Sequence, residues 1–301
     1  MDPDSRISED GSPLVNRPVP ADWLALRREA DHRAREKSAH LLDRLQRHLR
    51  ASGADSVHII DVGAGTGSNQ AWLATRLGLN QHWTLLDHDA GLIGVAEMLS
   101  LSTPQVSTDR QVGAIEDLPA LLESLKPASS SREHGPEGRP VLVTCAALLD
   151  LLTAAEAEIL VEAVASAGET WQAAGLFSLT VTGAVQISPQ DPEDGLISEA
   201  FDAHQRRGGI LGPDAAGAVA ALFAGRGMSV TVQETDWELS SDHSDLTHRY
   251  LIDRAAVAVE QDPALEQTAE AWVERRLHQL AQHQLLVRVG HTDMLVLPGP
   301  S

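Results

Sequence analysis

The sequence predicts an α/β fold built on a doubly wound, mostly parallel sheet of seven strands with helices on both faces. Three observations support this prediction. Residues 57–62 are mostly β-branched and apolar and run directly into glycines, as a buried parallel strand does at a tight turn. A second apolar run, 82–87, follows a helix-like stretch and ends in an acid. Strand-like and helix-like stretches then alternate towards the C-terminus.

The glycine turn after the first strand is the clearest candidate for a binding site. Residues 57–67 read VHIIDVGAGTG, and a helical stretch follows Ser68. A strand, a glycine turn and a helix in this order point backbone N–H groups at the open end of a sheet, where α/β folds bind ligands. The turn residues expected at a ligand are Asp61, Gly63, Ala64, Gly65 and Gly67.

The spacing Asp-x-Gly-x-Gly-x-Gly resembles the first motif of the class I S-adenosylmethionine (SAM) dependent methyltransferases, whose fold is Rossmann-like. The resemblance implies that the amino-acid end of SAM lies against the glycines while a carboxylate orients its ammonium group. The competing dinucleotide fingerprint, G-x-G-x-x-G, requires a third glycine where this chain has Ser68. An NAD-dependent oxidoreductase therefore remains the alternative interpretation.

Further cofactor contacts are expected at the ends of later strands. Asp87 closes the second strand 20 residues beyond Gly67, where an acid can accept both ribose hydroxyls. The resemblance implies an acid directly after Gly113 for the adenine amino group, but Ala114 occupies that position. Either of two nearby acids could replace it or simply cap the next helix. The additional residues expected at the cofactor are His88, Glu116, Asp117 and Cys145.

The N-terminal region divides into a polar tail and a helical cap. Residues 1–20 have the composition of a disordered tail, and apolar residues recur at helical spacing over 21–52. Arg27, Asp31 and Arg35 lie four residues apart on a neighbouring face of that helix. They form either an exposed ladder of ion pairs or a face that covers the active site. In the second case Trp23 and Arg27 would contact the substrate.

The acceptor side is expected to involve residues after the fourth and fifth strands. Asp150 is the one charge in the apolar stretch 147–152, and it belongs either to a surface turn or to the ligand site. In the insertion 185–213, Arg206 and Arg207 either belong to a solvated surface or hold a carboxylate or phosphate of the acceptor. His204 is the first candidate for a general base and His291 the second, since histidine titrates near neutral pH.

Composition excludes several classes of partner. The net charge of −20 argues against nucleic acid and anionic membranes. No apolar run is long enough to span a bilayer, and the N-terminus lacks the features of a secretion signal, so we expect a soluble, cytoplasmic protein. Cys145 is the lone cysteine, and no ligand spacing predicts a metal site. Residues 240–284 form a second, helical insertion that either packs outside the sheet or builds a homodimer contact.

The predicted function is methyl transfer from SAM to a small-molecule acceptor, by a single domain over residues 21–301. The segments ALLDLL, FDAHQRR and VGHTD also resemble an uncharacterised bacterial branch of methyltransferases, often labelled trans-aconitate-methyltransferase-like. Besides the NAD-dependent oxidoreductase, a non-catalytic nucleoside-binding protein and an aminopropyl transferase that uses decarboxylated SAM remain alternatives. The sequence does not identify the acceptor.

Overall fold

The computed structural model describes residues 20–51, 53–99, 104–125, 139–171 and 173–299. The tail predicted for residues 1–20 lies outside this part of the chain except for Pro20. The strands are β1 (Ser56–Val62), β2 (Asn80–Asp87), β3 (Val106–Val112), β4 (Val141–Ala146), β5 (Ala174–Ser188), β6 (Ser229–Glu234), β7 (Trp237–Leu239) and β8 (Leu286–Leu297). The helices are α1 (Ala21–Arg35), α2 (Ala39–Ala51), α3 (Ser68–Leu73), α4 (Ala90–Leu99), α5 (Leu118–Ser124), α6 (Ala154–Trp171), α7 (Asp194–Gln205), α8 (Ala215–Gly225), α9 (Ser244–Gln261) and α10 (Glu266–Ala281).

The sheet confirms the predicted α/β, Rossmann-like, doubly wound architecture. In the described part of the chain, seven strands follow the order β3-β2-β1-β4-β5-β8-β6, and the short β7 pairs with β8 as an eighth strand. Strands β1 to β5 are parallel to one another, and β8 runs antiparallel to β5, β6 and β7. The order of the strands changes direction at β1: β2 and β3 lie on one side of it, and β4 and β5 lie on the other. Ligands of such folds bind at the carboxyl ends of the strands beside this point.

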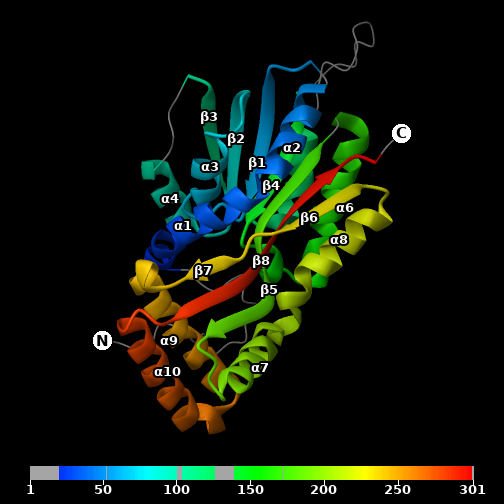
Figure 1. Ribbon diagram of the computed structural model, residues 1–301. Helices are drawn as coiled ribbons and strands as arrows, with labels where there is room; N and C mark the ends of the chain where they lie inside the picture. Colours follow the sequence, from blue (N-terminus) through cyan, green and yellow to red (C-terminus); the bar gives the residue numbers. More distant parts are fainter. Residues whose placement is uncertain (1–19, 52, 100–103, 126–138, 172, 300–301) are drawn as a thin grey trace, which may run out of the picture.

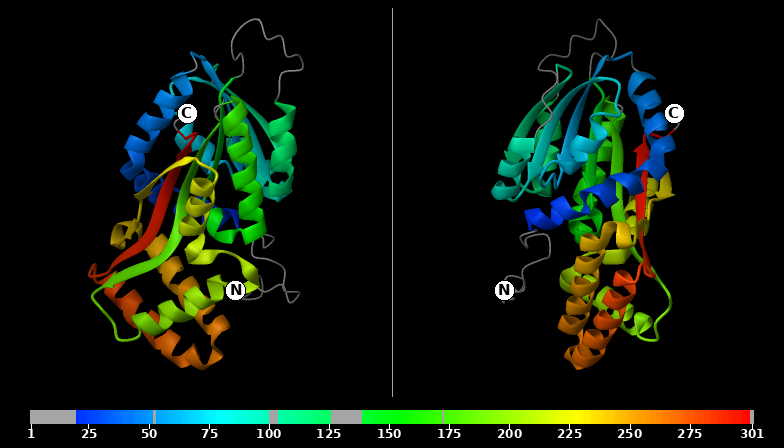
Figure 2. Two further views of the ribbon diagram at one scale, coloured as in Figure 1. Left: turned by 90° about the vertical axis from the view of Figure 1, so that its right-hand side faces the viewer. Right: turned by 60° about the vertical axis from the view of Figure 1, so that its left-hand side comes forward.

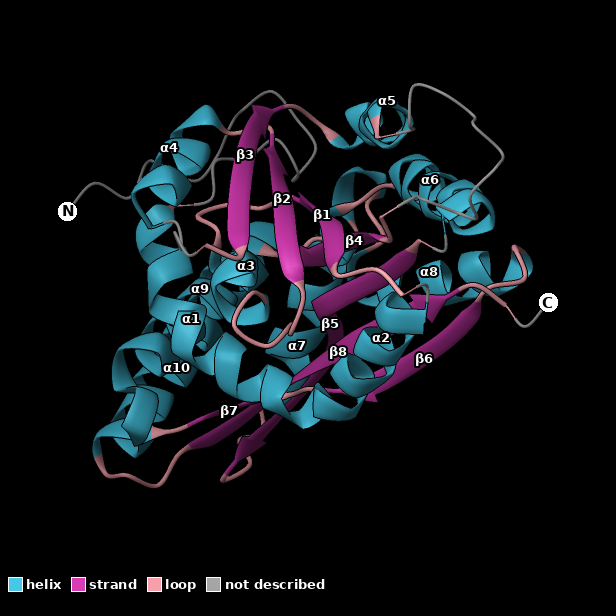
Figure 3. Ribbon diagram, turned by 90° about the horizontal axis from the view of Figure 1, so that it is seen from above, coloured by secondary structure: helices cyan, strands magenta, loops and turns pink. Residues whose placement is uncertain are grey.

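Helices cover both faces of the parallel part of the sheet (Figures 2 and 3). Val57 and Ile59 of β1 belong to one apolar cluster, with residues of α2, α3 and α4. Ile60 and Val62 belong to another, with residues of α5, α6 and α8. Because side chains alternate along a strand, a strand that is apolar on both faces must be buried on both faces. The mostly apolar run that predicted β1 is therefore explained by its two helical covers.

The two insertions pack together rather than separately. α7 lies in the first insertion and packs on α9, which packs on α10, both in the second. Figure 1 shows these three helices together at one end of the molecule, below β5, β7 and β8. The strand ends that extend beyond the parallel sheet contribute Ile187 and Val287 to the apolar cluster of this region. The region therefore has its own small core, continuous with the sheet through two long strands.

The N-terminal cap is divided, where the sequence predicts one helix over 21–52. A short 3₁₀ turn, η2 (Glu36–Ser38), separates α1 from α2. Leu41, Leu45 and Leu49 of α2 are fully buried against one face of the sheet. Of the two helices of this cap, α1 lines the pocket described below and α2 does not. In the described residues, no helix is both long enough and apolar enough to cross a membrane.

Candidate functional site

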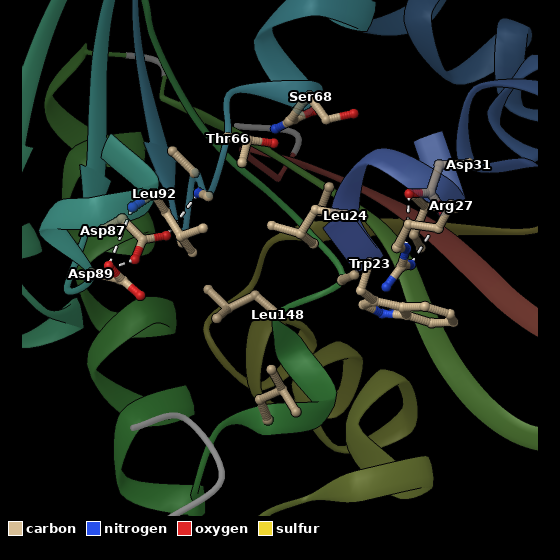
Figure 4. A pocket seen from close by; sticks show the side chains of 18 of the residues that line it. Trp23, Leu24, Arg27, Asp31, Thr66, Ser68, Asp87, Asp89, Leu92 and Leu148 are labelled. Carbon is tan, nitrogen blue, oxygen red and sulfur yellow. Dashed lines mark hydrogen bonds and ion pairs between the residues drawn. The ribbon is translucent and has the colours of Figure 1, made fainter. Parts of the chain in front are cut away.

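A pocket of about 300 Å³ opens at the carboxyl ends of β1, β2 and β4, beside the middle of β5, and is covered by α1. In Figure 4 the side chains of Trp23, Arg27 and Asp31 lie on one side of it and Asp87 and Asp89 on the other. Leu24 and Leu148 lie between these two sides (Figure 4). The residues proposed from the sequence that line the pocket are Trp23, Arg27, Gly63, Ala64, Gly65, Asp87, His88 and Asp150.

The glycine turn after β1 forms one wall of the pocket. Gly63, Gly65 and Gly67 have φ angles of 64°, 54° and 78°, which other residues rarely adopt. A Cβ atom on Gly63 would also lie 3.0 Å from the Leu148 Cδ1 atom. The alternation of glycines is thus required by the path of the backbone. Gly67 precedes α3 and lies outside the pocket lining.

Asp87 connects this turn to the end of β2. One carboxylate oxygen accepts a hydrogen bond from the Gly65 N–H (2.7 Å) and the other from the Asp89 N–H (2.9 Å). A carboxylate offers about four acceptor positions, so Asp87 retains capacity for two ligand hydroxyls. Asp89 instead accepts hydrogen bonds from the Gly91 and Leu92 N–H groups at the start of α4. Of the two acids, Asp89 therefore acts as the helix cap.

Arg35 is a buried cation in the pocket wall. Its side chain lies over the Trp72 ring, with 3.8 Å from Cζ to the ring centroid, and only 1% of the residue is exposed. Its Nε and Nη2 atoms are buried without a hydrogen-bond partner. Burial lowers the pKa of Arg35, while the carboxylates of Asp293, Asp61 and Asp31 oppose that shift. A buried guanidinium with free donors is costly unless an anionic ligand completes its hydrogen bonds.

Asn69 lies in the same wall, and Asp61 lies behind it. Asn69 Nδ2 donates to Asp61 Oδ1 (2.6 Å) and to Thr144 Oγ1 (3.2 Å). These bonds fix the amide, and Asn69 Oδ1 is buried without a partner. Asp61 is fully buried and does not itself line the pocket. Burial raises its pKa to about 7, against the hydrogen bond from Asn69 and the charge of Arg35.

The ladder on α1 faces the pocket rather than solvent. Arg27 donates two hydrogen bonds to Asp31, at 2.9 and 3.1 Å, and both side chains are largely buried. Asp31 also accepts a hydrogen bond from Trp237 Nε1 (3.0 Å), and Arg27 lies over the Trp237 ring. Of the two interpretations of this helix face, the geometry supports the one in which it covers the site.

Asp150 approaches the pocket from the end of β4. It lies in η4 (Leu149–Leu151), just after Ala147, whose φ of 55° turns the chain over the pocket. The Asp150 residue is partly exposed, but its Oδ1 atom is buried and has no hydrogen-bond partner. Burial raises the pKa of Asp150 to about 6, and Arg27 opposes this shift. The carboxyl group is therefore poised to exchange a proton near neutral pH.

A second cavity of about 130 Å³ adjoins the first and shares Gly63, Asp87, His88 and Leu148 with it. Ala114 and Glu116 also line this cavity. Asp117 accepts a hydrogen bond from the Ala114 N–H (2.9 Å) and so caps the turn η3 (Ile115–Asp117). Of the two acids proposed near the adenine, Glu116 is the one that reaches the cavity.

Cys145 lies beneath both cavities, in the apolar core, and burial raises the pKa of its thiol. It lines neither cavity. In the part of the chain that the structure describes, no group of three or more His, Cys, Asp or Glu residues is arranged to hold a metal ion.

The structure does not bring the side chains proposed for an anionic acceptor into the pocket. His204 is buried against Glu260 of α9, with 3.0 Å between Nε2 and Oε2. Arg206 pairs with Asp214 (2.9 Å), and Arg207 donates to the backbone carbonyl groups of Glu260 and Gln261. The insertion that carries these residues folds onto α9. The sequence shows only that the insertion follows β5, and this does not predict the contact with α9.

His291 also lies outside the pocket lining. It packs on the Trp237 ring, with 4.8 Å between centroids, and Nδ1 lies 3.0 Å from the Val289 carbonyl oxygen. Burial, reinforced by Arg27, lowers its pKa to about 4. Arg35 and Asn69 also line the pocket, and neither of them is among the site residues predicted from the sequence. Their only signals were the four-residue spacing on α1 and the position of Asn69 just after the glycine turn.

No protein-family model matches the chain, and no curated protein matches it. Solved structures that resemble it include the YcgJ protein from Bacillus subtilis, with 11% identity and a TM-score of 0.45 over 87% of this chain and 99% of that one. The cyclopropane synthase MmaA2 from Mycobacterium tuberculosis has 11% identity and a TM-score of 0.42 over 81% and 79%. A SAM-dependent methyltransferase from Geobacter sulfurreducens, solved with S-adenosyl-L-homocysteine, has 15% identity and a TM-score of 0.35 over 86% and 90%. Likenesses this distant assign neither substrate nor family to this chain.

Proposed function

We propose that the pocket under α1 binds SAM and that the protein transfers its methyl group to a small molecule. The observation that carries this proposal is a set of buried polar atoms in the pocket wall without partners: Arg35 Nε and Nη2, Thr66 Oγ1, Asn69 Oδ1 and Asp150 Oδ1. Buried polar atoms in proteins nearly always have hydrogen-bond partners. A ligand that supplies the missing partners therefore accounts for the arrangement.

The chemistry of these atoms fits the amino-acid end of SAM. The free guanidinium donors of Arg35 suit a carboxylate, which they can hold in a bidentate geometry. The free carbonyl oxygen of Asn69 suits an ammonium group, and the Asp61 carboxylate behind it adds a negative charge. In this arrangement Asp61 acts as a positioning residue, through the amide of Asn69.

The nucleoside end would extend from Asp87 into the smaller cavity. Asp87 retains acceptor positions for the two ribose hydroxyls, and it lines both cavities. The adenine would then occupy the space beside Ala114, with Glu116 in reach of its amino group. This assigns to Glu116 the contact for which the sequence left two candidates.

The charge of the pocket favours SAM over a dinucleotide. Its lining includes the carboxyl groups of Asp31, Asp87, Asp89 and Asp150 against the guanidinium groups of Arg27 and Arg35. Such a surface repels a pyrophosphate and attracts a sulfonium cation. The NAD-dependent alternative therefore has no support from the lining.

When bound, SAM supplies an electrophilic methyl group on a sulfonium, which a nucleophile displaces in line. The residues of this chain would contribute position and desolvation. Arg35, Asn69 and Asp87 fix the two ends of the cofactor, so that the acceptor meets the methyl group in one orientation. Leu24 and Leu148, between the two sides of the pocket, exclude water from the reacting atoms.

The experiment is titration calorimetry of the purified protein with SAM and with NAD. Arg35→Met should weaken SAM binding by about 1.5–3 kcal/mol, the usual contribution of a hydrogen bond to a charged group. Arg33→Met is the matched control, because Arg33 lies two residues away on α1 in an exposed pair with Glu29. Asn69→Ala provides a second variant if Arg35→Met melts too early to be measured. Binding of NAD in place of SAM, or undiminished SAM affinity in both pocket variants, would contradict the proposal.

A further inference from the structure

One part of the pocket remains unused once the two ends of SAM are assigned. It lies between α1, the end of β4 and the middle of β5, and its lining residues are Trp23, Arg27, Ala147, Asp150, Leu179 and Val181. Most of this lining is apolar. The charge of Arg27 is already balanced by two hydrogen bonds to Asp31. The remaining unpaired group is the Oδ1 atom of Asp150.

We propose that Asp150 takes a proton from the methyl acceptor, and that the acceptor is an amine which enters the pocket as an ammonium ion. This inference rests on the proposed function, since it assigns the acceptor of that same site. The Asp150 carboxyl group lies beside its own backbone and the backbone of Val181. Its Oδ1 atom is left to receive a donor from the ligand.

The charge of the pocket favours an ammonium ion over other acceptors. Bound SAM adds one positive charge to a lining with four carboxyl groups and two guanidinium groups, so the site remains acidic. A carboxylate or phosphate acceptor would meet that charge without a free cation, because Arg206 and Arg207 are engaged elsewhere. The Trp23 ring adds an aromatic surface of the kind that attracts cations.

The reaction balances without any further reactant. The ammonium group gives one proton to Asp150, which becomes a neutral carboxylic acid, and leaves a neutral amine with a lone pair. A bond forms between that nitrogen and the methyl carbon, while the carbon–sulfur bond breaks and its electron pair stays on sulfur. The products are a methylated ammonium ion and the neutral thioether, and Asp150 returns its proton to solvent when they leave.

An aliphatic hydroxyl group suits this carboxylate less well than an ammonium ion. With a pKa of about 6, Asp150 is ionised at neutral pH and can still hold a proton transiently. An ammonium ion titrates near 10, as the lysine side chain does, so its proton transfer to Asp150 is far less unfavourable than that of an alcohol.

Few other charges act on Asp150 from the elements packed against it. η4 packs against β5, η6 (Gly212–Asp214) and α8. β5 and α8 carry no charged side chain, and Asp214 of η6 is paired with Arg206. Arg27 of α1 and the Cys145 thiol of β4 are the other titratable groups whose charges couple to Asp150. A pH response of the acceptor side can therefore be assigned to Asp150.

The experiment needs no knowledge of the acceptor. Sinefungin carries an ammonium group where SAM carries its methyl sulfonium, whereas S-adenosylhomocysteine carries a neutral thioether. Wild-type protein should bind sinefungin about tenfold or more tightly than S-adenosylhomocysteine at pH 7.5, because the ammonium group meets Asp150. Asp150→Asn should reduce this ratio to about one. The matched control is Glu158→Gln, the same change at an exposed position on α6, and it should leave the ratio as in wild type.

A second measurement uses wild-type protein alone. The ratio should fall between pH 7.5 and pH 5, as Asp150 is protonated, and it should be flat with pH in Asp150→Asn. Effects on the amino-acid end cancel, since both ligands share it. A ratio near one in wild type, or a ratio that Asp150→Asn leaves unchanged, overturns the inference while the SAM site stands. If neither ligand binds, the proposed function is overturned together with it.

Discussion

The pocket under α1 and the contact between α7 and α9 are built from the same residue types, and both regions leave buried polar atoms without partners, which on α9 are Arg254 Nε and Nη2 and Gln261 Oε1. Around the pocket, Arg35, Asn69 and Asp150 have buried atoms without partners. In the helical region, Arg206 pairs with Asp214 and Arg207 with two carbonyl groups, and His204 meets Glu260. The presence of arginine and histidine does not identify a site. The unpartnered atoms of Arg35, Asn69 and Asp150 line a cavity, and this is why we propose the site there.

The largest expected effect separates a carboxylate of the pocket from one of the helical region. Asp87→Ala should weaken SAM binding by about 3 kcal/mol, because it removes an ionised acceptor and leaves the Gly65 and Asp89 N–H groups unpaired. Asp214→Ala breaks the exposed pair with Arg206 and should leave SAM affinity unchanged. Calorimetry on both variants measures the difference. Equal losses would mean that the comparison does not distinguish the two regions.

A smaller effect should appear in the pH dependence of binding. The pKa of Asp61 is raised to about 7, so its carboxyl group is increasingly neutral below that pH. The ammonium group of SAM favours the ionised form of Asp61. At low pH, where Asp61 is protonated in the free protein, SAM binding must therefore release the proton of this carboxyl group. Affinity for SAM should fall about 25-fold from pH 7.5 to pH 5.5, and about one proton should be released per molecule bound at pH 5.5. Asp61→Asn should flatten this profile, and calorimetry in buffers of different ionisation enthalpy counts the proton.

The same shift predicts the stability of the free protein. The folded-state pKa of Asp61 lies above the unfolded value, so folding binds a proton between about pH 4 and 7 and this group destabilises the fold increasingly as pH rises through that window. Asp61→Asn should therefore raise the free energy of unfolding at pH 8 by about 1–3 kcal/mol, and by less at pH 5. A variant that is more stable and binds more weakly would identify Asp61 as a group kept for function. Loss of stability at both pH values would contradict this interpretation.

The smallest expected effect concerns the helical region. His204→Gln should leave SAM affinity within about 0.3 kcal/mol of wild type and lower stability by about 1 kcal/mol, since the contact with Glu260 is partly buried. Thermal melting measures the change in stability, and calorimetry on the same preparation measures the change in SAM affinity. A large loss of SAM affinity would contradict the position of His204 outside the pocket lining.

Local patterns predicted the frame of the site well. β1, the glycine turn and Asp87 follow from short runs whose chemistry is complete within a few residues. Thr153 and Glu156 form an equally local capping box at the start of α6, in which the backbone N–H of each residue donates to the side chain of the other. These features need no information about distant parts of the chain.

Long-range packing explains what the sequence could not predict. Arg206 and Arg207 follow β5 in the sequence, but their partners lie on α9 and in η6. The way in which the insertion folds determines these partners. Arg35 and Arg33 are two similar residues on one helix, and only burial shows that Arg35 faces the pocket while Arg33 is exposed. A sequence lists polar groups without showing which of them folding leaves unpaired.

The length of β5 has a consequence for how specificity could change. This single strand pairs with β4 at Ala174, passes the acceptor side of the pocket at Leu179 and Val181, and reaches the core of the helical region at Ile187. One continuous strand therefore connects the wall of the pocket with the helical region. Exchanging residues 185–213 and 240–284 as a unit with those of a relative would leave the SAM contacts intact. On the proposed function, such an exchange would change the neighbours of β5 without replacing any residue that lines the pocket.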